Sequence, residues 1–167
     1  SRGNEKGEIF RSTGDYEKFL SYVGAAREKY GFYLHTYVLM SNHYHLFIEL
    51  TDCNLSRIMQ LLNTSYTVYF NRKYQRSGHL FQGRYKSFIV DTDNYYSELT
   101  RYIHLNPVRA GIVDDPVDYT WSSYRDYLRP RCESFADMPA VERYLTIDLK
   151  RYRPFVFEGI GKEERFL

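Results

Sequence analysis

The chain has 167 residues, a length typical of one domain or of one domain with a tail. It carries 23 Lys and Arg against 21 Asp and Glu, and 43% of its residues are hydrophobic, which excludes a globally disordered protein. No apolar run is long enough for a transmembrane helix, and the polar residues 1–10 do not resemble a signal peptide. Cys53 and Cys132 form no CxxC pair, so we expect no disulfide framework and a cytoplasmic location.

The first expected helix covers residues 15–30. Ser12 and Asp15 have the spacing of a capping box, and apolar residues then recur at helical spacing until Gly31. Two strands, 32–40 and 43–50, follow this helix, separated by a short turn. This segment therefore predicts a helix packed beside a β-hairpin.

A second helix is expected after Asn54, which can act as its N-cap. Its apolar stripe consists of Leu55, Ile58, Met59, Leu62, Tyr66 and Tyr69. Residues 80–90 predict a third strand. Asp93 can cap a third helix, which we expect to end at Asn106-Pro107, because the residue before a proline disfavours helix.

A strand before Ser1 would complete the order β-α-β-β-α-β, the ferredoxin-like pattern. The predicted fold class is therefore α+β, an RRM-like antiparallel sheet with helices packed on it. We predict one domain over residues 1–113, with its first strand upstream of residue 1, and a partly helical C-terminal extension over residues 114–167.

Residues 54–86 contain six basic side chains and no acidic one. Basic groups supply phosphate contacts, and the aromatic residues among them can stack on bases. A solvated helix face is the alternative, but the absence of any balancing acid favours nucleic acid. Arg84 and Lys86 have the same strand parity and could face phosphate together. The basic residues are Arg57, Arg72, Lys73, Arg76, Arg84 and Lys86.

His43 and His45 are separated by one residue on the second expected strand, so their side chains share one face. Two imidazoles in this arrangement can chelate one divalent ion, although structural histidines with the same spacing are common. His35, His79 and His104 have no such spacing, and we expect them to be packed or at the surface.

Tyr102 and Asn106 lie four residues apart, on one face of the third expected helix. The Asn106 side-chain oxygen could complete a His-His-Asn site, and oxygen ligands suit Mg²⁺ or Mn²⁺. Tyr102 would then lie one helical turn from the ion. Spacing alone leaves open the alternative of an ordinary surface tyrosine, since the chain has 18 tyrosines.

Three ordered blocks of sequence resemble the single-tyrosine HUH transposases. Residues 37–46 read YVLMSNHYHL, which is similar to that family's histidine–bulky residue–histidine signature. Residues 78–85 (GHLFQGRY) and 101–111 (RYIHLNPVRAG) resemble two downstream blocks. The resemblance covers residues 2–128 and is closest to the branch of REP-associated tyrosine transposases. Ser41 stands where the family commonly has proline, at a turn position.

The resemblance implies an enzyme that cuts and rejoins single-stranded DNA beside a hairpin. It assigns His43, His45 and Asn106 as ligands of Mg²⁺ or Mn²⁺, and Tyr102 as the nucleophile that forms a 5′-phosphotyrosine. Tyrosine hydroxyls ordinarily have a pKa of about 10, so they need activation, and a metal on the scissile phosphate can orient and polarise it. We expect DNA contacts from the basic stretch and from Arg101 and Arg109. No membrane and no organic cofactor is expected.

Two other functions stay open at this point. One is a non-catalytic, ferredoxin-like nucleic-acid-binding module. The other is a metal-dependent hydrolase with a water nucleophile, which would need the histidines and Asn106 but not Tyr102. Some relatives exchange the tyrosine helix between subunits, but the REP-associated branch can work as a monomer. The short helix expected before Pro107 favours a monomer with its site in cis.

Overall fold

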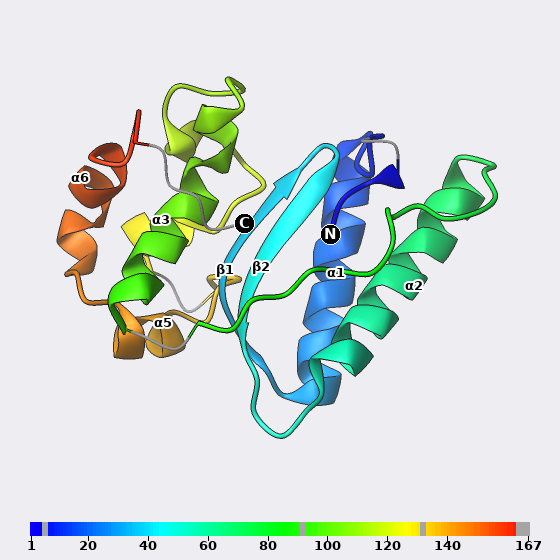
Figure 1. Ribbon diagram of the computed structural model, residues 1–167, viewed down its shortest axis with the longest axis horizontal. Coiled ribbons are helices and arrows are strands. Elements are labelled where there is room, and N and C mark those ends of the chain that lie inside the picture. The colour runs from blue at the N-terminus through cyan, green and yellow to red at the C-terminus, as the bar shows by residue number, and fades with distance from the viewer. Residues whose placement is uncertain (5–6, 91–92, 131–132, 163–167) are drawn as a thin grey trace. The chain divides into compact units, whose positions relative to one another are not determined.

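The structure is a computed structural model that describes residues 1–4, 7–90, 93–130 and 133–162 (Figure 1). The long elements are three helices and one β-hairpin, which confirms the predicted α+β class. Within the described residues, no helix is both long and apolar enough to cross a membrane. In chain order the elements are α1 (Thr13–Tyr30), β1 (Tyr33–Met40), β2 (His43–Glu49), α2 (Leu55–Lys73), α3 (Asp93–Arg109), η2 (Pro116–Asp118), α4 (Tyr124–Leu128), α5 (Met138–Tyr144), η3 (Leu149–Arg151) and α6 (Tyr152–Phe157).

Contacts divide the chain into two compact units. The first comprises Ser1–Tyr33, Leu39–Tyr44 and Glu49–Ser87, and the second comprises Leu34–Val38, His45–Ile48 and Phe88–Leu167. The hairpin contributes its turn to the first unit and its middle to the second. The predicted domain boundary after residue 113 stays a prediction, since the second unit contains both α3 and the predicted extension.

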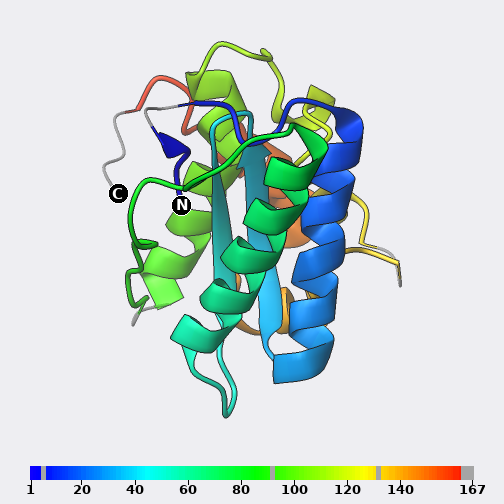
Figure 2. The same cartoon turned by 90° about the vertical axis from the view of Figure 1, so that its right-hand side faces the viewer.

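In the first unit, α1 and α2 lie side by side and antiparallel (Figure 2). The capping box of Ser12 and Asp15 is formed, and Gly31 ends α1 in the left-handed conformation at φ 69°, which glycine adopts without steric cost. Asn54 caps α2 by accepting a hydrogen bond from the Ser56 backbone N–H at 2.8 Å. The sequence therefore predicted the cap of each helix, although α1 begins at Thr13 rather than at residue 15. The buried side chains between the helices include Phe19, Val23, Ile58, Leu62 and Tyr66.

The strand predicted over residues 80–90 is wrong. Phe81 makes an isolated antiparallel bridge with Gly3, and Arg2 makes another with His43. Among the described residues, 82–90 have no bridge partner, and Ile89 is 94% exposed. A strand needs a neighbouring backbone to complete its ladder, so β-propensity alone did not produce one. Arg84 and Lys86 therefore do not share a strand face. Residues 2–3 lie where the fold pattern expects the strand that precedes α1.

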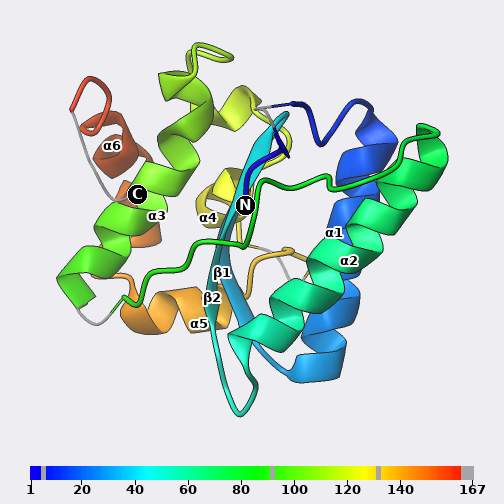
Figure 3. The same cartoon turned by 45° about the vertical axis from the view of Figure 1, so that its right-hand side comes forward.

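In the second unit, residues that follow α3 pack against the middle of β1. Val38 bridges Ser122, and the Leu34 backbone N–H donates to the Asp137 carboxylate at 2.6 Å. Figure 3 shows α3 beside α6, and α3 also contacts α5. The residues after α3 thus complete a hydrophobic core rather than forming a loose tail. That core consists of Leu105, Tyr124, Tyr127, Ala136, Met138, Val141, Tyr152 and Val156.

The Asp15 carboxylate joins the start of α1 to the end of α2. It is fully buried and accepts hydrogen bonds from the backbone N–H groups of Arg11 and Ser12 at 2.8 and 3.0 Å. The Lys73 ammonium and the Tyr74 hydroxyl donate to it at 2.6 and 2.7 Å. Burial by itself raises the pKa of Asp15, but the hydrogen bonds from Lys73, Tyr74 and the backbone outweigh it and hold the pKa at about 2.

We predict that Asp15→Asn lowers the free energy of unfolding by roughly 2–4 kcal/mol at pH 7, because Lys73 then loses its buried anion. The folded-state pKa of Asp15, about 2, lies below its unfolded value, so its stabilisation is complete near neutral pH and is lost as pH falls from about 4 towards 2. Urea unfolding at pH 7 and at pH 3 measures both effects. Glu17→Gln, an exposed carboxylate on the same helix, is the control. Equal losses for the two variants at pH 7 would contradict the prediction.

Candidate active site

His45 and Tyr102 lie together in the second unit. Their ring centroids are 6.2 Å apart, with the rings nearly perpendicular at 83°. His45 comes from β2 and Tyr102 from the middle of α3, so the fold joins the residues of two separate sequence blocks. Both side chains are half-buried, which leaves a part of each in contact with solvent.

His43 precedes His45 by two positions on β2, so strand alternation gives the two imidazoles the same face. His43 belongs to the first unit, and the Nδ1 atom of His43 lies 2.6 Å from the side-chain oxygen of Asn42. An amide oxygen only accepts, so Nδ1 carries the proton and the ring's lone pair lies on Nε2. This hydrogen bond is the kind of outer contact that fixes the tautomer and orientation of a metal-binding histidine.

Asn106 keeps α3 helical through Pro107. Its side-chain nitrogen donates to the backbone carbonyls of Tyr102 at 2.9 Å and Ile103 at 3.3 Å. The Ile103 carbonyl is the one that the missing N–H of Pro107 would have bound in a regular helix. The helix therefore continues to Arg109, and the predicted end at Asn106-Pro107 is wrong. The predicted capping role of Asp93 is not tested, because its side chain lies outside the described part of the structure.

The amide of Asn106 also has a defined orientation. Because its nitrogen is turned to the helix backbone, its oxygen is directed away from those carbonyls and is the end that could bind a cation. Within the described residues, no three His, Cys, Asp or Glu side chains come together as a metal site. The His, Cys, Asp and Glu side chains of the described residues therefore do not form a complete metal site by themselves.

The positively charged guanidinium of Arg109 lies over the ring of Tyr102. Its guanidinium carbon lies 4.9 Å from the centre of the Tyr102 ring, and Nη1 is 3.5 Å from the Tyr102 backbone carbonyl. The seven-residue separation brings the two residues to one face of α3 after about two turns. Sequence spacing predicted Arg109 as a DNA contact but did not reveal that it packs on the candidate nucleophile.

The remaining histidines have structural or surface positions. His104 is fully buried, and burial lowers its pKa to about 3. Its Nδ1 and Nε2 lie 2.8 Å from the hydroxyls of Tyr152 and Ser123. His35 is buried with Nδ1 2.7 Å from the Tyr96 hydroxyl, whereas His79 is exposed. The sequence showed no signal for these buried contacts beyond the absence of ligand spacing.

The basic residues fall into three groups. Lys73 is bound to Asp15, and hydrogen bonds from its ammonium to Asp15 and Tyr69 raise its pKa. Arg101 is only 6% exposed, pairs with Glu98 and lies 4.4 Å from the Phe155 ring centre, so it has an internal role. The others are exposed at the surface: Arg57, Arg72, Arg76, Arg84, Lys86 and Arg109.

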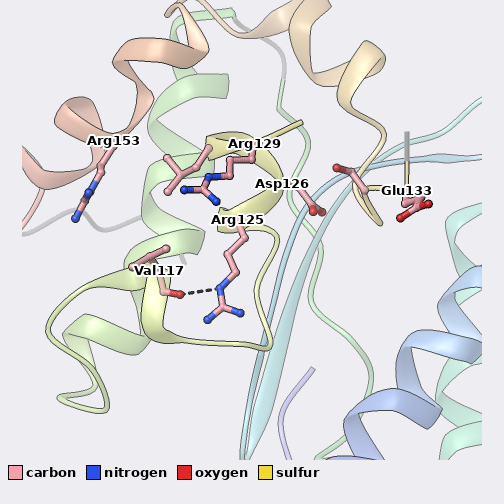
Figure 4. A pocket seen from close by; sticks show the side chains of 8 residues that line it. Val117, Arg125, Asp126, Arg129, Glu133 and Arg153 are labelled. Atoms are coloured by element: carbon pink, nitrogen blue, oxygen red, sulfur yellow. Dashed lines mark hydrogen bonds between the residues drawn. The ribbon is translucent and has the colours of Figure 1, made fainter. Parts of the chain in front are cut away.

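A pocket of about 560 Å³ lies in the second unit, among residues 117–153 (Figure 4). Three arginines line it, but Arg125 donates to the Val117 carbonyl at 2.8 Å and Arg153 pairs with Asp115 at 2.5 Å. Asp126 and Glu133 also line the pocket. Its charges are thus largely balanced, and none of the predicted site residues contributes to it.

Two comparisons with known proteins gave a match. The family model described as "Transposase IS200 like" matches residues 2–106. A solved structure of a REP-associated tyrosine transposase bound to a REP hairpin has a similar fold, with a TM-score of 0.60 and 22% identity over 75% of this chain and 74% of that one. No curated protein matches the sequence. The family match covers the first two blocks, the third as far as Asn106, and more than half of the chain, and the chain therefore belongs to the IS200-like transposase family.

Proposed function

We propose that this transposase binds single-stranded hairpin DNA and cleaves and rejoins it through a 5′-phosphotyrosine at Tyr102. The contact of Tyr102 with both His45 and Arg109 carries the proposal, because it places a nucleophile beside an imidazole and a cation. The similar solved structure is that of a protein bound to a REP hairpin, which supports hairpin DNA as the ligand class. A cytoplasmic location stays a prediction.

The residues present fit a divalent cation. Asn42 leaves the lone pair of His43 on Nε2, and the Asn106 amide leaves its oxygen for a ligand. Two imidazole nitrogens and an amide oxygen suit Mn²⁺, and Mg²⁺ when phosphate and water complete the shell. An ion held by His43, His45 and Asn106 would supply the positive charge that polarises the scissile phosphate.

The remaining bonds are made and broken at Tyr102 and the DNA. The Tyr102 hydroxyl gives its proton to solvent as its oxygen attacks phosphorus, the bond from phosphorus to the 3′ oxygen breaks, and the 3′ oxygen takes up a proton and leaves as a hydroxyl. The DNA 3′ of the cut stays attached to Tyr102 through its 5′-phosphate. Arg109, on the face of the Tyr102 ring, can neutralise phosphate charge during attack. A second 3′-hydroxyl reverses these steps and rejoins the strands.

The exposed cations of the basic stretch would hold the DNA backbone. Arg57, Arg72 and Arg76 lie on α2 or just after it, and Arg84 and Lys86 follow in the irregular segment. Phosphate contacts of this kind determine affinity and its salt dependence. We leave Arg101 and Lys73 out of this set because both are already paired within the protein.

The alternative is a nucleic-acid-binding module without catalysis. The basic, aromatic α2 segment would serve either function equally. The convergence of His45, Tyr102 and Arg109 favours the enzyme, since DNA binding alone does not require that contact. The sequence favoured a monomer because α3 was expected to end before Pro107. The helix continues to Arg109, so this argument no longer holds. The monomer stays a prediction that rests on the resemblance alone.

We predict that Tyr102→Phe abolishes a metal-dependent covalent adduct between the protein and DNA. The substrate is 3′-end-labelled single-stranded DNA with an imperfect palindrome, so the label stays on the fragment that carries the 5′-phosphate. A denaturing gel with Mn²⁺ or Mg²⁺ separates the slow adduct from free DNA. Tyr95→Phe, an exposed tyrosine on the same helix, should keep the adduct.

The same gel distinguishes the alternatives. Nicking that persists in Tyr102→Phe would indicate a water nucleophile and contradict the proposal. Tight hairpin binding by the unaltered protein, with neither adduct nor nick in either metal, would favour the binding module.

We predict that Asn42→Ala weakens Mn²⁺ binding by roughly 10- to 100-fold, because the acceptor that orients His43 is lost. Titration calorimetry or the electron paramagnetic resonance signal of free Mn²⁺ measures the affinity directly, without DNA. His45→Ala should weaken binding at least as much. Ser41→Ala, in the same turn, serves as the control. An Asn42→Ala affinity equal to that of the Ser41→Ala protein would overturn the prediction.

We predict that Arg72→Ala weakens hairpin binding and lowers the slope of log affinity against log salt by about 1, because one phosphate contact is lost. Fluorescence anisotropy over a salt series, with Tyr102→Phe as background to prevent cleavage, gives both values. Lys18→Ala removes an exposed charge from α1, outside the basic stretch. If both substitutions change the slope equally, the basic stretch has no special role.

A further inference from the structure

A chain of buried hydrogen bonds runs through His104 on α3. One end is the Tyr37 backbone N–H on β1, which donates to the Ser123 hydroxyl at 3.0 Å. Ser123 and Tyr152 each lie 2.8 Å from a ring nitrogen of His104. At the other end, Tyr152 donates to Thr100 at 3.0 Å, and Thr100 donates to the Ser97 carbonyl at 2.8 Å. The side chains that form this hydrogen-bond chain are all buried: Ser123, His104, Tyr152 and Thr100.

The direction of each bond follows from the number of hydrogens. Thr100 gives its hydrogen to a carbonyl, so it must accept from Tyr152. Tyr152 has then used its only hydrogen, so Nδ1 of His104 must be the donor in their contact. A neutral imidazole protonated at Nδ1 accepts at Nε2, so the Ser123 hydroxyl donates there and in turn accepts from the Tyr37 N–H. The Tyr37 carbonyl is a second acceptor for the same Ser123 hydrogen, but it lies at 3.3 Å, whereas Nε2 of His104 lies at 2.8 Å, and the shorter contact favours His104.

This chain ties α3 to two other elements at one level of the helix. Ser123 precedes α4 and binds the backbone of β1, whereas Tyr152 begins α6. His104 lies midway between Tyr102 and Asn106. A helix turns about 100° per residue, so a side chain held here fixes the rotation of both neighbours. Sliding α3 by one residue would break both imidazole bonds and leave buried polar atoms unpaired.

We propose that His104 is a positioning residue, held as the Nδ1–H tautomer by Ser123 and Tyr152, that fixes the rotation of α3 and so the aim of Tyr102. The inference rests on the proposed function, because it concerns attack by Tyr102. It assigns the C-terminal extension a part in catalysis without any contact to DNA, since Tyr152 belongs to α6.

The first test concerns the tautomer and needs no DNA. Long-range proton–nitrogen correlations on ¹⁵N-histidine-labelled protein show which ring nitrogen carries the proton. The His104 ring is assigned through its contact with the Tyr127 ring, whose centroid is 4.7 Å away. We expect a protonated Nδ1 and an unprotonated Nε2. Protonation at Nε2 would overturn the chain as described.

The second test separates positioning from general stability. Tyr152→Phe removes one hydroxyl from the chain but keeps the aromatic ring that packs on Tyr127. Tyr124→Phe is the matched control: Tyr124 is fully buried beside His104, and its hydroxyl has no hydrogen-bond partner among the described residues. Single-turnover adduct formation at saturating hairpin DNA gives the rate constant, and anisotropy in a Tyr102→Phe background gives the DNA affinity.

We expect Tyr152→Phe and Ser123→Ala to lower the rate constant by roughly 10- to 100-fold, because a small misplacement of a reacting group is costly, while the DNA affinity stays unchanged. Tyr124→Phe should keep both values. All measurements are made at a temperature where circular dichroism shows each variant folded. If Ser123→Ala does not fold, Tyr152→Phe, which conserves the core packing, decides the test.

The outcomes are distinct for the two proposals. An adduct from the unaltered protein whose rate constant is the same in Tyr152→Phe would reject the positioning role and leave the proposed function intact. A parallel loss of rate in Tyr152→Phe and Tyr124→Phe would also reject it, since core packing would then explain both. No adduct from the unaltered protein would reject the proposed function, and the positioning role with it.

Discussion

The structure depends on helix α3 remaining helical through a proline. Pro107 removes a backbone donor, and the Asn106 side chain replaces it by donating to the carbonyls of Tyr102 and Ile103. Without this bond the helix would be free to kink between Tyr102 and Arg109, and the packing of Arg109 on the Tyr102 ring would be lost. One amide thus serves two purposes: its nitrogen keeps the helix intact, and its oxygen is the end available to a cation.

A buried polar group stabilises the interior of each unit. In both units, hydrogen bonds satisfy nearly all the polar atoms of that group. In the first unit, the Asp15 carboxylate is buried at the junction of α1 and α2, where five donors satisfy it: two backbone N–H groups, Lys73 and two tyrosines. In the second, the His104 imidazole is buried between two hydroxyls. Such groups specify one arrangement of helices, because any alternative leaves a polar atom without a partner.

The abundance of tyrosine has a structural explanation in this protein. Tyr66, Tyr124, Tyr127 and Tyr152 are among its largest fully buried side chains, and three of the four hydroxyls bind within the interior. Tyrosine combines a large apolar ring with a polar tip, so it can fill a core and anchor a backbone at once. Tyr102 differs from these because it is half-buried, beside His45. Location therefore separates the candidate nucleophile from the structural tyrosines, whereas composition does not.

The sequence by itself determined the helix boundaries at Ser12, Gly31 and Asn54 and the hairpin, and it predicted that His45 and Tyr102 belong to one site. These are local features, in which caps, alternation and ordered motifs depend on residues a few positions apart. Only the tertiary structure decided that residues 82–90 form no ladder, that α3 passes through Pro107, and that Arg101 is internal while Arg109 packs on Tyr102. Strand pairing, burial and side-chain replacement of a lost backbone bond depend on neighbours in space. Sequence spacing does not contain that information.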